Sequence, residues 1–272
     1  MPELPEVETL RCDLRPRFVG HRLERAEVTG PRTVRRHPPE LLAQLHGDVL
    51  AEVGRHGKYL LFQWASGRAL VAHLRMSGQL LASEPGTPLA RHTHAVLWFG
   101  GAGQLRFVDP RTFGELFMAS SPGPQVAEIA HLGPDALAAG AGYLVAELAR
   151  RRAPLKSVLV DQRVLAGIGN IYADEICFDA RLRPDRPAAA LRPVHVQRLA
   201  ASVRRVLAAA VQARGSTLAD GQYVDLNGQA GRYQGAHMVY GRAGQPCRRC
   251  GREVARLAWG ARQAYACTHC QH

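Results

Sequence analysis

The chain has 272 residues, with 35 Lys or Arg against 23 Asp or Glu, which gives a formal net charge of +12 at pH 7. Hydrophobic residues make up 46% of it, which predicts a folded protein with a substantial core rather than a disordered one. No apolar run is long enough to span a bilayer, and the first residues lack a cationic and apolar leader. These features argue against a membrane protein and lead us to expect a cytoplasmic one with no membrane partner.

The excess of positive charge favours a polyanionic partner. Each neutralised phosphate releases counterions and adds affinity whatever the base sequence. Arginine, which far outnumbers lysine here, also binds phosphate through a planar fork. A GC-rich genome, which enriches arginine in every protein, would give a similar composition. Charge alone therefore favours a nucleic acid without establishing it.

The first predicted element is a helix over residues 5–18. Val7, Leu10, Leu14 and Phe18 recur at spacings of three and four, which places them on one helical face. Proline at position 5 suits the first turn of such a helix.

The residue pattern of the remaining chain changes along its length. Short β-rich runs separated by Gly, Pro and Ser turns at 22–118 predict a β-sandwich or barrel, and SSPGPQ at 120–125 is typical of a linker. The pattern then becomes helical, over 135–152, 154–166, 170–180 and 193–215. A glycine-rich stretch at 215–235 predicts a mobile loop. We expect an α+β, multidomain fold divided into 1–120, 121–235 and 236–272.

Two Cys-x-x-Cys pairs near the end predict a metal site. Cys247 and Cys250 are separated from Cys267 and Cys270 by sixteen residues, and four thiolates in this arrangement suit one tetrahedral, structural Zn²⁺. Disulfides are the alternative, which a cytoplasmic chain disfavours. The other two cysteines, Cys12 and Cys177, are expected to be small buried hydrophobic residues.

The segment between the two pairs alternates like a β-hairpin with a turn near Gly260. Arg262 follows that turn, where a projecting arginine would reach a nucleic-acid groove or a phosphate. A solvated surface arginine is the alternative, and this stretch alone would favour it.

A second motif, LAGIGNIYADE at 165–175, predicts a glycine turn between two helices. Gly167 and Gly169 allow a tight turn, and Asn170 would cap a helix that begins at Ile171. The free amides of such a helix start hold a phosphate well. An ordinary helix–helix turn explains the local pattern equally well.

Two further motifs each end a strand and enter a turn that contains glycine, HLRMSG at 73–78 and DPRTFG at 109–114. They place Met76 and Phe113 near loop tips, where such side chains would act as wedges in a base stack. Arg111 would then fill the space of a displaced base. Packing of both apolar residues in the core is the alternative, which the local sequence favours.

The opening MPELPEVETL raises a chemical question. If Met1 is removed, Pro2 presents a secondary amine, part of which is unprotonated near neutral pH. Its attack on a sugar carbon gives an iminium that is cationic at every pH and promotes β-elimination. Glu3 would donate a proton to the sugar ring oxygen. The alternative is structural: Pro2 and Pro5 stiffen the helix entry, while Glu3 suits the positive end of the helix dipole.

Taken together, the motifs resemble the formamidopyrimidine-DNA glycosylase family of bifunctional base-excision repair enzymes. The motifs that carry the resemblance follow the family's order from end to end: PELPEVE, KYLLF, HLRMSG, DPRTFG, GIGNIYADE, MVYGRAGQPC and the four cysteines. The resemblance implies an N-terminal helix and β-sandwich, a helical domain with a helix–two-turn–helix motif, and a C-terminal zinc finger with a β-hairpin. This implied fold agrees with the domain organisation expected from the residue patterns along the chain.

The resemblance also implies a role for each matched residue. Pro2 would be the nucleophile that forms a Schiff base, Glu3 the proton donor, Lys58 an acid that assists β-elimination, and Arg262 the group that assists δ-elimination. The residues expected to hold DNA are His92, Arg111, Arg152, Lys156 and Asn170. The residues that resemble the inserted group are Met76, Arg111 and Phe113.

The activity implied is excision of 8-oxoguanine and ring-opened purines from damaged double-stranded DNA, followed by strand cleavage at the abasic site. The loop resembling 215–235 would cover the extruded base. A monomer associated with the nucleoid, with one structural Zn²⁺ and no organic cofactor, is expected. Two positions depart from the pattern: Arg75 stands where relatives often have glycine, and Thr112 where they often have a second arginine.

Two other functions compete with this one. The sister branch that removes oxidised pyrimidines usually opens PEGPE, so Leu4 argues against it. A catalytically silent DNA-binding protein would keep the finger and the helical motif, but it would not require Pro2, Glu3 and Lys58.

Overall fold

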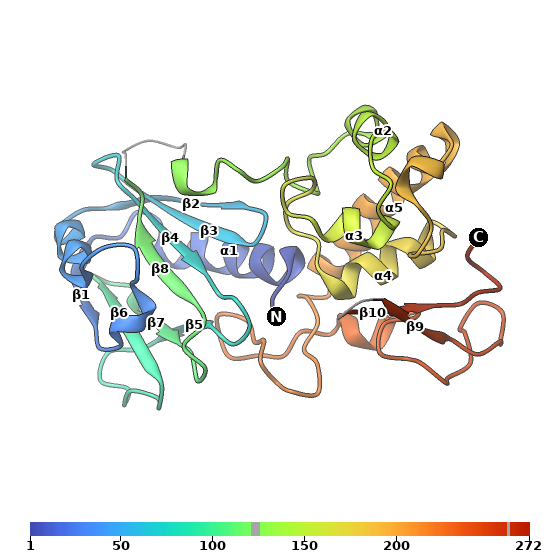
Figure 1. Ribbon diagram of the computed structural model, residues 1–272. Coiled ribbons are helices and arrows are strands. Elements are labelled where there is room, and N and C mark those ends of the chain that lie inside the picture. The colour runs from blue at the N-terminus through green and yellow to red at the C-terminus, as the bar shows by residue number, and fades with distance from the viewer. Residues whose placement is uncertain (121–125, 260–261) are drawn as a thin grey trace. The chain divides into compact units, whose positions relative to one another are not determined.

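The computed structural model describes residues 1–120, 126–259 and 262–272, which form two compact units (Figure 1). The first unit comprises Met1–His131 and Ala213–Arg232, and the second comprises Leu132–Gln212 and Tyr233–His272. Most of the expected linker at 120–125, and the expected turn at Gly260, lie outside the described residues. The three-part division expected from the sequence stays a prediction, because compactness alone does not assign the returning segment or the finger to a domain.

The predicted N-terminal helix is present as α1 (Leu4–Phe18). Its start is stabilised by a reciprocal pair, in which the Glu3 carboxylate accepts from the Glu6 amide and the Glu6 carboxylate accepts from the Glu3 amide at 2.8 Å. The apolar face of the helix is fully buried and packs against β2 and β3.

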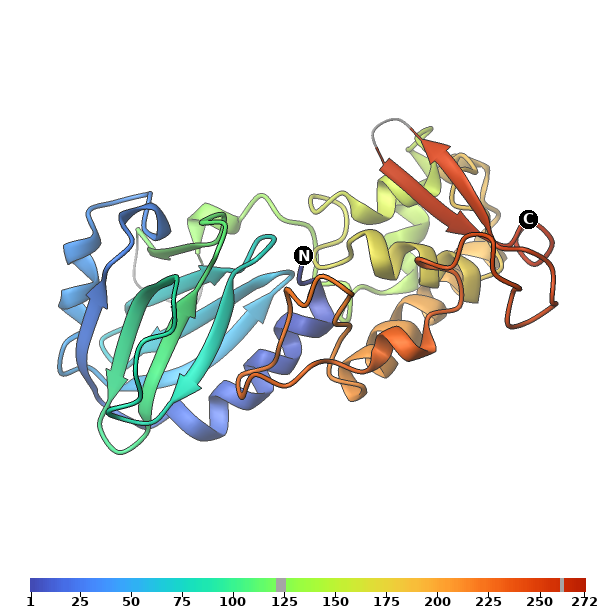
Figure 2. The ribbon, with the colours of Figure 1, turned by 90° about the horizontal axis from the view of Figure 1, so that it is seen from below.

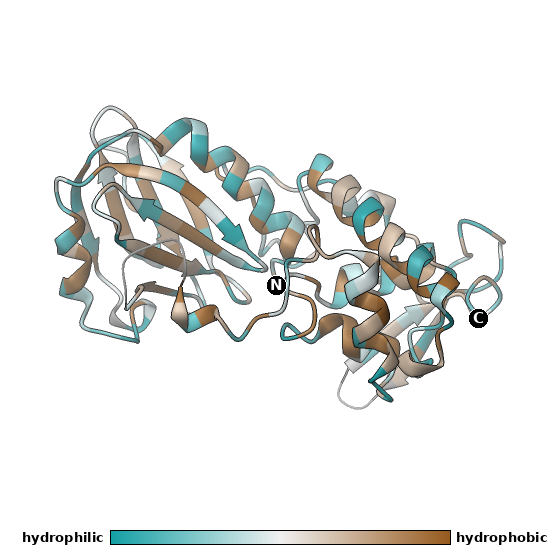
Figure 3. Cartoon of the chain, turned by 90° about the horizontal axis from the view of Figure 1, so that it is seen from above, coloured by the Kyte–Doolittle hydropathy of each residue, from teal (hydrophilic) through white to brown (hydrophobic). Residues whose placement is uncertain are grey.

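The β-rich region forms the predicted sandwich of two antiparallel four-stranded sheets. The strands of the first sheet, in spatial order, are β1 (Leu23–Val28), β6 (Thr93–Phe99), β7 (Gly103–Val108) and β5 (Gln79–Ser83). Those of the second are β2 (Leu50–His56), β3 (Tyr59–Trp64), β4 (Ala69–His73) and β8 (Glu115–Met118). Apolar residues run along the strands of both sheets (Figure 3).

Aromatic packing joins the helix to the sandwich core. The Phe18 and Phe99 rings are 4.9 Å apart, and Trp64 stacks on Phe99 at 5.9 Å. The returning segment 213–232 contributes to the same core through Tyr223 and Leu226, both buried. This segment is therefore part of the sandwich unit in its packing as well as in its position.

The second unit contains four helices among its described residues and a two-stranded hairpin. Their bounds are α2 (Ala141–Ala149), α3 (Leu155–Val160), α4 (Asn170–Asp179), α5 (Pro193–Gln212), β9 (Ala255–Trp259) and β10 (Arg262–Ala266). The long helix α5 packs on α2 and α4, and α4 also contacts β10 (Figure 2). Short 3-10 helices occupy Pro31–Thr33, Pro39–Leu45, Ala127–Ile129, Ala188–Ala190 and Tyr233–Ala236. None of the described helices is both long and apolar enough for a membrane crossing.

Candidate functional site

The N-terminal residues lie at the entry of α1. Pro2 is buried and Glu3 is only 2% exposed, whereas Met1 is 47% exposed. The hydrogen bonds between Glu3 and Glu6 realise the structural alternative, in which these residues begin a helix. The same bonds hold the Glu3 backbone next to Pro2, so the structural role is compatible with the catalytic one, which stays a prediction.

Glu6 also attaches the returning segment to this helix. Its Oε1 accepts the Ser216 amide at 2.7 Å. Gly215 has a φ of +77°, and a Cβ there would come within 2.7 Å of the same Glu6 oxygen. Only glycine tolerates both this positive φ and the close approach of the Glu6 oxygen without strain. The segment is held further along by Arg214, which forms ion pairs with Asp13 and Asp225.

Lys58 lies in the tight turn between β2 and β3 and is 7% exposed. Its charge acts on His73 at the end of β4, where burial, together with the cations Arg75 and Lys58, lowers the His73 pKa to about 3. Nδ1 of His73 accepts the Arg75 amide at 3.1 Å, which fixes the neutral tautomer with its proton on Nε2. The sequence reasoning overlooked His73, although it is the first residue of the HLRMSG motif.

Met76 and Phe113 are exposed, so the alternative of core packing is wrong for both. Their exposed fractions are 44% and 42%, so both side chains are available to contact a binding partner. The Arg111 guanidinium lies 4.8 Å from the centre of the Phe113 ring. The structure therefore brings Arg111 and Phe113 together.

A single buried carboxylate ties the two exposed loops to each other. Asp109 Oδ1 accepts the Ser77 hydroxyl at 2.5 Å and the Arg111 amide at 3.1 Å, and Oδ2 accepts the Gly114 amide at 2.7 Å. Asp109 is fully buried, and its own amide donates to the His92 carbonyl at 3.0 Å. The Asp109 carboxylate thus positions the backbone on both sides of Phe113.

The two departures from the family pattern share one backbone conformation. Arg75 has a φ of +52° and Thr112 a φ of +55°, in the left-handed region that favours glycine. Arg75 donates to Glu115 at 3.0 Å, and the Thr112 carbonyl accepts from Arg35 at 2.6 Å. The conformation at Arg75 is one that glycine adopts without strain.

In the second unit the predicted glycine turn is present, but its cap differs from the prediction. Helix α4 begins at Asn170, and Gly169, in an extended conformation, is the N-cap. The expectation that Asn170 caps a helix starting at Ile171 was therefore wrong, because the extended Gly169 lets the helix start one residue earlier. The turn is held by Gln162, whose side chain accepts the Gly167 amide at 3.0 Å. Asn170 is exposed.

Lys156 and Arg152 differ sharply in exposure. Arg152 is exposed, whereas Lys156 is fully buried, with Nζ 2.8 Å from Asp174 Oδ1 and 2.6 Å from the Gln263 carbonyl. Burial raises the Asp174 pKa, and the charge of Lys156 opposes that rise. Lys156 therefore connects α3, α4 and the hairpin, and its predicted phosphate contact stays a prediction.

The next acid, Glu175, binds the MVYGR motif. Its carboxylate accepts three consecutive amides, those of Met238, Val239 and Tyr240, at 2.8 to 2.9 Å. Burial raises the Glu175 pKa and these amides oppose the rise. The two acids of GIGNIYADE thus organise two later segments of the same unit.

The four cysteines of the two pairs converge, as predicted. Their Sγ atoms all lie within 4.8 Å of one another, and the Cys250 and Cys267 sulfurs are 3.5 Å apart. None of the six described cysteines forms a disulfide, so the geometry indicates a structural metal site closed by four thiolates. Of the other two, Cys177 is buried as predicted, whereas Cys12 is exposed on α1, contrary to the prediction.

Arg262 is the first residue of β10 and pairs with Trp259 across the hairpin. The two strands predicted between the cysteine pairs are therefore present and antiparallel, with Arg262 at the start of the second strand.

Comparison with known proteins identifies the class of protein to which this site belongs. The family model for the formamidopyrimidine-DNA glycosylase N-terminal domain matches residues 1–116, and the model for the H2TH domain of the same glycosylases matches residues 132–221. Together with the four-cysteine site, these matches identify a DNA repair enzyme, a DNA glycosylase.

Relatives match this sequence over its whole length, and the chain belongs to the formamidopyrimidine-DNA glycosylase family. The chain is 44% identical to the formamidopyrimidine-DNA glycosylase of Salinispora arenicola, with 100% of this chain and 96% of the relative covered. A crystal structure of MutM (Fpg) from Thermus thermophilus is 41% identical with a TM-score of 0.88, covering 99% of this chain and 98% of the other. Lactococcus lactis Fpg in complex with DNA containing an abasic site is 31% identical, with a TM-score of 0.90 and 99% of both chains covered.

Proposed function

We propose that the chain excises oxidised purines, namely 8-oxoguanine and formamidopyrimidines, from duplex DNA and then cleaves the strand at the abasic site. The observation that carries the proposal is the pair of exposed apolar residues, Met76 and Phe113, on two loops joined by one buried carboxylate. A protein that only bound DNA phosphates would not need them. Structures of Lactococcus lactis Fpg with DNA containing Fapy-dG or an abasic site support the substrate class.

The chemistry begins at Pro2 once Met1 has been removed. Its nitrogen bonds to C1′ of the deoxyribose as the bond from C1′ to the base breaks, and the base leaves with a proton. Glu3 donates a proton to the ring oxygen, which opens the sugar and leaves a cationic iminium, the Schiff base. Loss of a C2′ proton then expels the 3′ phosphate with assistance from Lys58, and a second elimination assisted by Arg262 expels the 5′ phosphate.

Extrusion of the damaged base precedes this chemistry. Rotating a base out of a duplex costs a few kcal/mol, and least at a damaged pair. Met76 and Phe113 would enter the stack, and Arg111, held near Phe113, would occupy the space left by the base. His92, which is hydrogen-bonded to Asp109 through its carbonyl, lies close enough to the same loop to share the contact with DNA.

Phosphate contacts offset the cost of extrusion. Arg152 and Asn170 have exposed side chains, and Asn170 is at the start of α4, where free amides and the helix dipole favour an anion. For Lys156 we propose a contact that requires its ion pair with Asp174 to open, since its side chain is buried.

The metal is proposed to be one Zn²⁺, held by Cys247, Cys250, Cys267 and Cys270. Bonds of about 2.3 Å to four thiolates give sulfur–sulfur edges of about 3.8 Å, close to the 3.5 Å between Cys250 and Cys267. With four thiolates the shell is closed, so the ion would supply folding energy to the finger and take no part in bond breaking. A cytoplasmic monomer on double-stranded DNA, without an organic cofactor, completes the proposal.

Borohydride trapping on a duplex with one 8-oxoguanine tests the function. Reduction of the iminium gives a stable covalent adduct, which we expect for the native chain and not for Pro2→Gly, whose DNA affinity should stay near the native value. An adduct of equal yield with Pro2→Gly would reject Pro2 as the nucleophile. Intact-mass measurement of the adduct gives a second check, because it must lack Met1.

The same assay separates the two competing functions. A silent DNA-binding protein gives no adduct with any lesion. A member of the sister branch gives more adduct with an oxidised pyrimidine than with 8-oxoguanine at equal duplex affinity. We expect the opposite order.

A further inference from the structure

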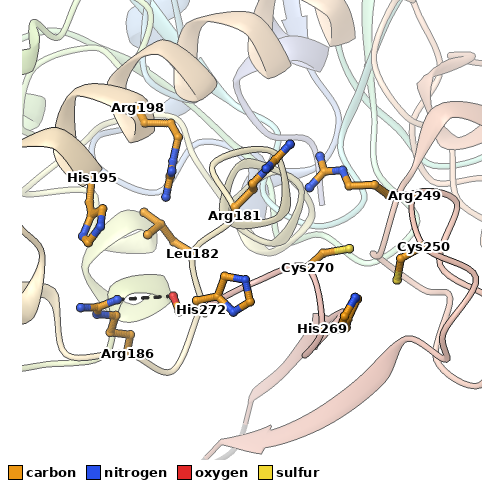
Figure 4. A pocket seen from close by; sticks show the side chains of 10 residues that line it. All are labelled: Arg181, Leu182, Arg186, His195, Arg198, Arg249, Cys250, His269, Cys270 and His272. Atoms are coloured by element: carbon orange, nitrogen blue, oxygen red, sulfur yellow. Dashed lines mark hydrogen bonds between the residues drawn. The ribbon is translucent and has the colours of Figure 1, made fainter.

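The second unit contains a cavity of about 470 Å³ that the proposed function does not use. It is enclosed by the loop after α4, the first turns of α5, the finger and the last residues of the chain (Figure 4). Of the ten described residues that line it, four are arginines, three are histidines and none is an acid. The arginines are Arg181, Arg186, Arg198 and Arg249.

The carboxylates nearest in sequence are engaged elsewhere. Asp179 forms an ion pair with Arg205, and Asp185 forms one with Arg183 at 2.5 Å. Within the described parts of the chain, no acidic side chain makes an ion pair with any of the four cavity arginines. The positive charges of these four arginines are therefore not balanced by a neighbouring acidic side chain.

Two of the arginines are oriented by main-chain oxygens. The Arg249 guanidinium lies 4.1 Å from the centre of the Phe178 ring and donates to the Phe178 carbonyl at 3.3 Å. Arg186 donates to the Ala190 carbonyl at 3.1 Å and to the main-chain oxygen of His272 at 3.5 Å. The Phe178 and Ala190 carbonyls orient these guanidinium groups without removing their charge, so both side chains are positioned before any ligand arrives.

The other lining side chains that face the cavity are cationic or neutral. In Figure 4 the guanidinium groups of Arg181 and Arg249 turn toward each other, so an anion between them would contact both. His195, in the first turn of α5, has its pKa lowered by burial and by the cations Arg192, Arg186 and Arg198. The lowered pKa favours the neutral imidazole, which is a hydrogen-bonding group without net charge.

We propose that this cavity binds an anion that carries two or more phosphate groups. Guanidinium forks match phosphate oxygens two at a time, and the volume lies within the usual range for small-ligand sites of about 300–1,000 Å³. The phosphates would come from a free nucleoside di- or triphosphate or from neighbouring phosphodiesters of a nucleic-acid strand. In both cases the recognising groups are Arg181, Arg198 and the two oriented arginines.

The alternative role for these arginines is to balance the negative charge of the metal site, and it predicts a different result. Cys250 and Cys270 also line the cavity, and a divalent metal with four thiolates carries a net charge of −2. If the arginines served only to balance that charge, removing them would weaken metal binding and leave no phosphate site.

Titration calorimetry of the full-length, metal-loaded chain with inorganic pyrophosphate distinguishes the two roles. We expect binding to the native chain and a loss of at least tenfold in affinity for Arg181→Gln/Arg198→Gln, with metal content and unfolding temperature unchanged. Arg204→Gln is the matched control, since it removes one exposed charge from the same helix α5 outside the cavity. Absence of pyrophosphate binding, an equal loss in the control, or loss of metal from the double variant would overturn the proposal.

A competition arm identifies the source of the phosphates. If duplex DNA displaces pyrophosphate, and the double variant binds DNA less tightly than the control, the ligand is a strand backbone. If pyrophosphate binds equally to the free chain and to its DNA complex, the ligand is a free polyphosphate. The site is independent of the proposed glycosylase chemistry, so a failure of pyrophosphate binding would leave that chemistry untouched.

Discussion

The Ser77 hydroxyl lies 2.5 Å from Oδ1 of the buried Asp109 carboxylate, and this bond connects the loop that carries Met76 with the loop that carries Phe113. The remaining bonds of Asp109, to the Arg111 and Gly114 amides, stay within the second loop. The Ser77 bond is therefore a contact that can be removed without disturbing the conformation of either loop by itself.

Ser77→Ala tests whether the two loops act together. Loss of a buried hydrogen bond to a charged group should lower the free energy of unfolding by about 1–3 kcal/mol. If the loops enter the duplex as one unit, excision from a fully paired duplex should slow by more than strand cleavage at a preformed abasic site. Single-turnover rates on both substrates measure this. Ser83→Ala, on β5 of the same sandwich, is the control, and equal slowing on both substrates would contradict the idea.

His73 should make the stability depend on pH. Its pKa is about 3 in the folded chain against 6.5 for an ordinary histidine, so between these values the unfolded chain binds a proton that the folded chain does not. The contribution of neutral His73 to the free energy of unfolding is therefore fully present above pH 6.5. It is lost as the pH falls toward 3, by up to about 5 kcal/mol. Urea unfolding of the native chain and of His73→Gln over this range should give a shallower slope for the variant. Parallel curves would contradict the assignment.

The left-handed conformation of Thr112 should cost stability. A β-branched residue at a φ of +55° is strained, whereas asparagine adopts this region readily. Thr112→Asn should therefore raise the free energy of unfolding by about 1 kcal/mol while keeping the backbone bond to Arg35. Thr87→Asn, at an exposed site without a positive φ, is the control for side-chain chemistry. Chemical denaturation measures both, and a destabilised Thr112→Asn would show that the threonine side chain contributes more than the strain removes.

Loss of one thiolate should separate the finger from the sandwich. Cys250→Ser leaves three sulfur ligands, so we expect loss of bound zinc, measured by elemental analysis, and a large loss of DNA affinity. The sandwich core shares no residue with the small core around the cysteines, so its cooperative unfolding should persist. Retention of one metal per chain in the variant would contradict the four-thiolate shell.

Local patterns predicted the elements well where one physical rule dominates. The spacing of Val7, Leu10, Leu14 and Phe18 predicted α1, because a buried helical face has a period that no other structure shares. The cysteine spacing predicted the converging thiolates, because two adjacent ligands per turn suit a tetrahedral ion.

The sequence was less informative where the outcome depends on burial or on the conformation of the backbone. For Met76 and Phe113 the local pattern favoured the core, whereas the resemblance placed them at loop tips, and their exposure agrees with the resemblance. His73 was overlooked because its lowered pKa results mainly from burial, with a contribution from the cations Arg75 and Lys58, and the local sequence does not reveal that burial. The cap at Gly169 was misassigned because asparagine is the commoner capping residue, whereas here a backbone conformation decides where the helix starts.

The consecutive acids Asp174 and Glu175 have a consequence for how the finger is oriented. One helix reaches the hairpin through Lys156 and the Tyr265 amide, and reaches residues 238–240 through three amides. The metal shapes the interior of the finger, but the angle at which the finger is mounted is set from α4. A substitution that disturbs these acids would therefore tilt a finger whose metal site is intact, and its effect on DNA binding would resemble that of removing the metal.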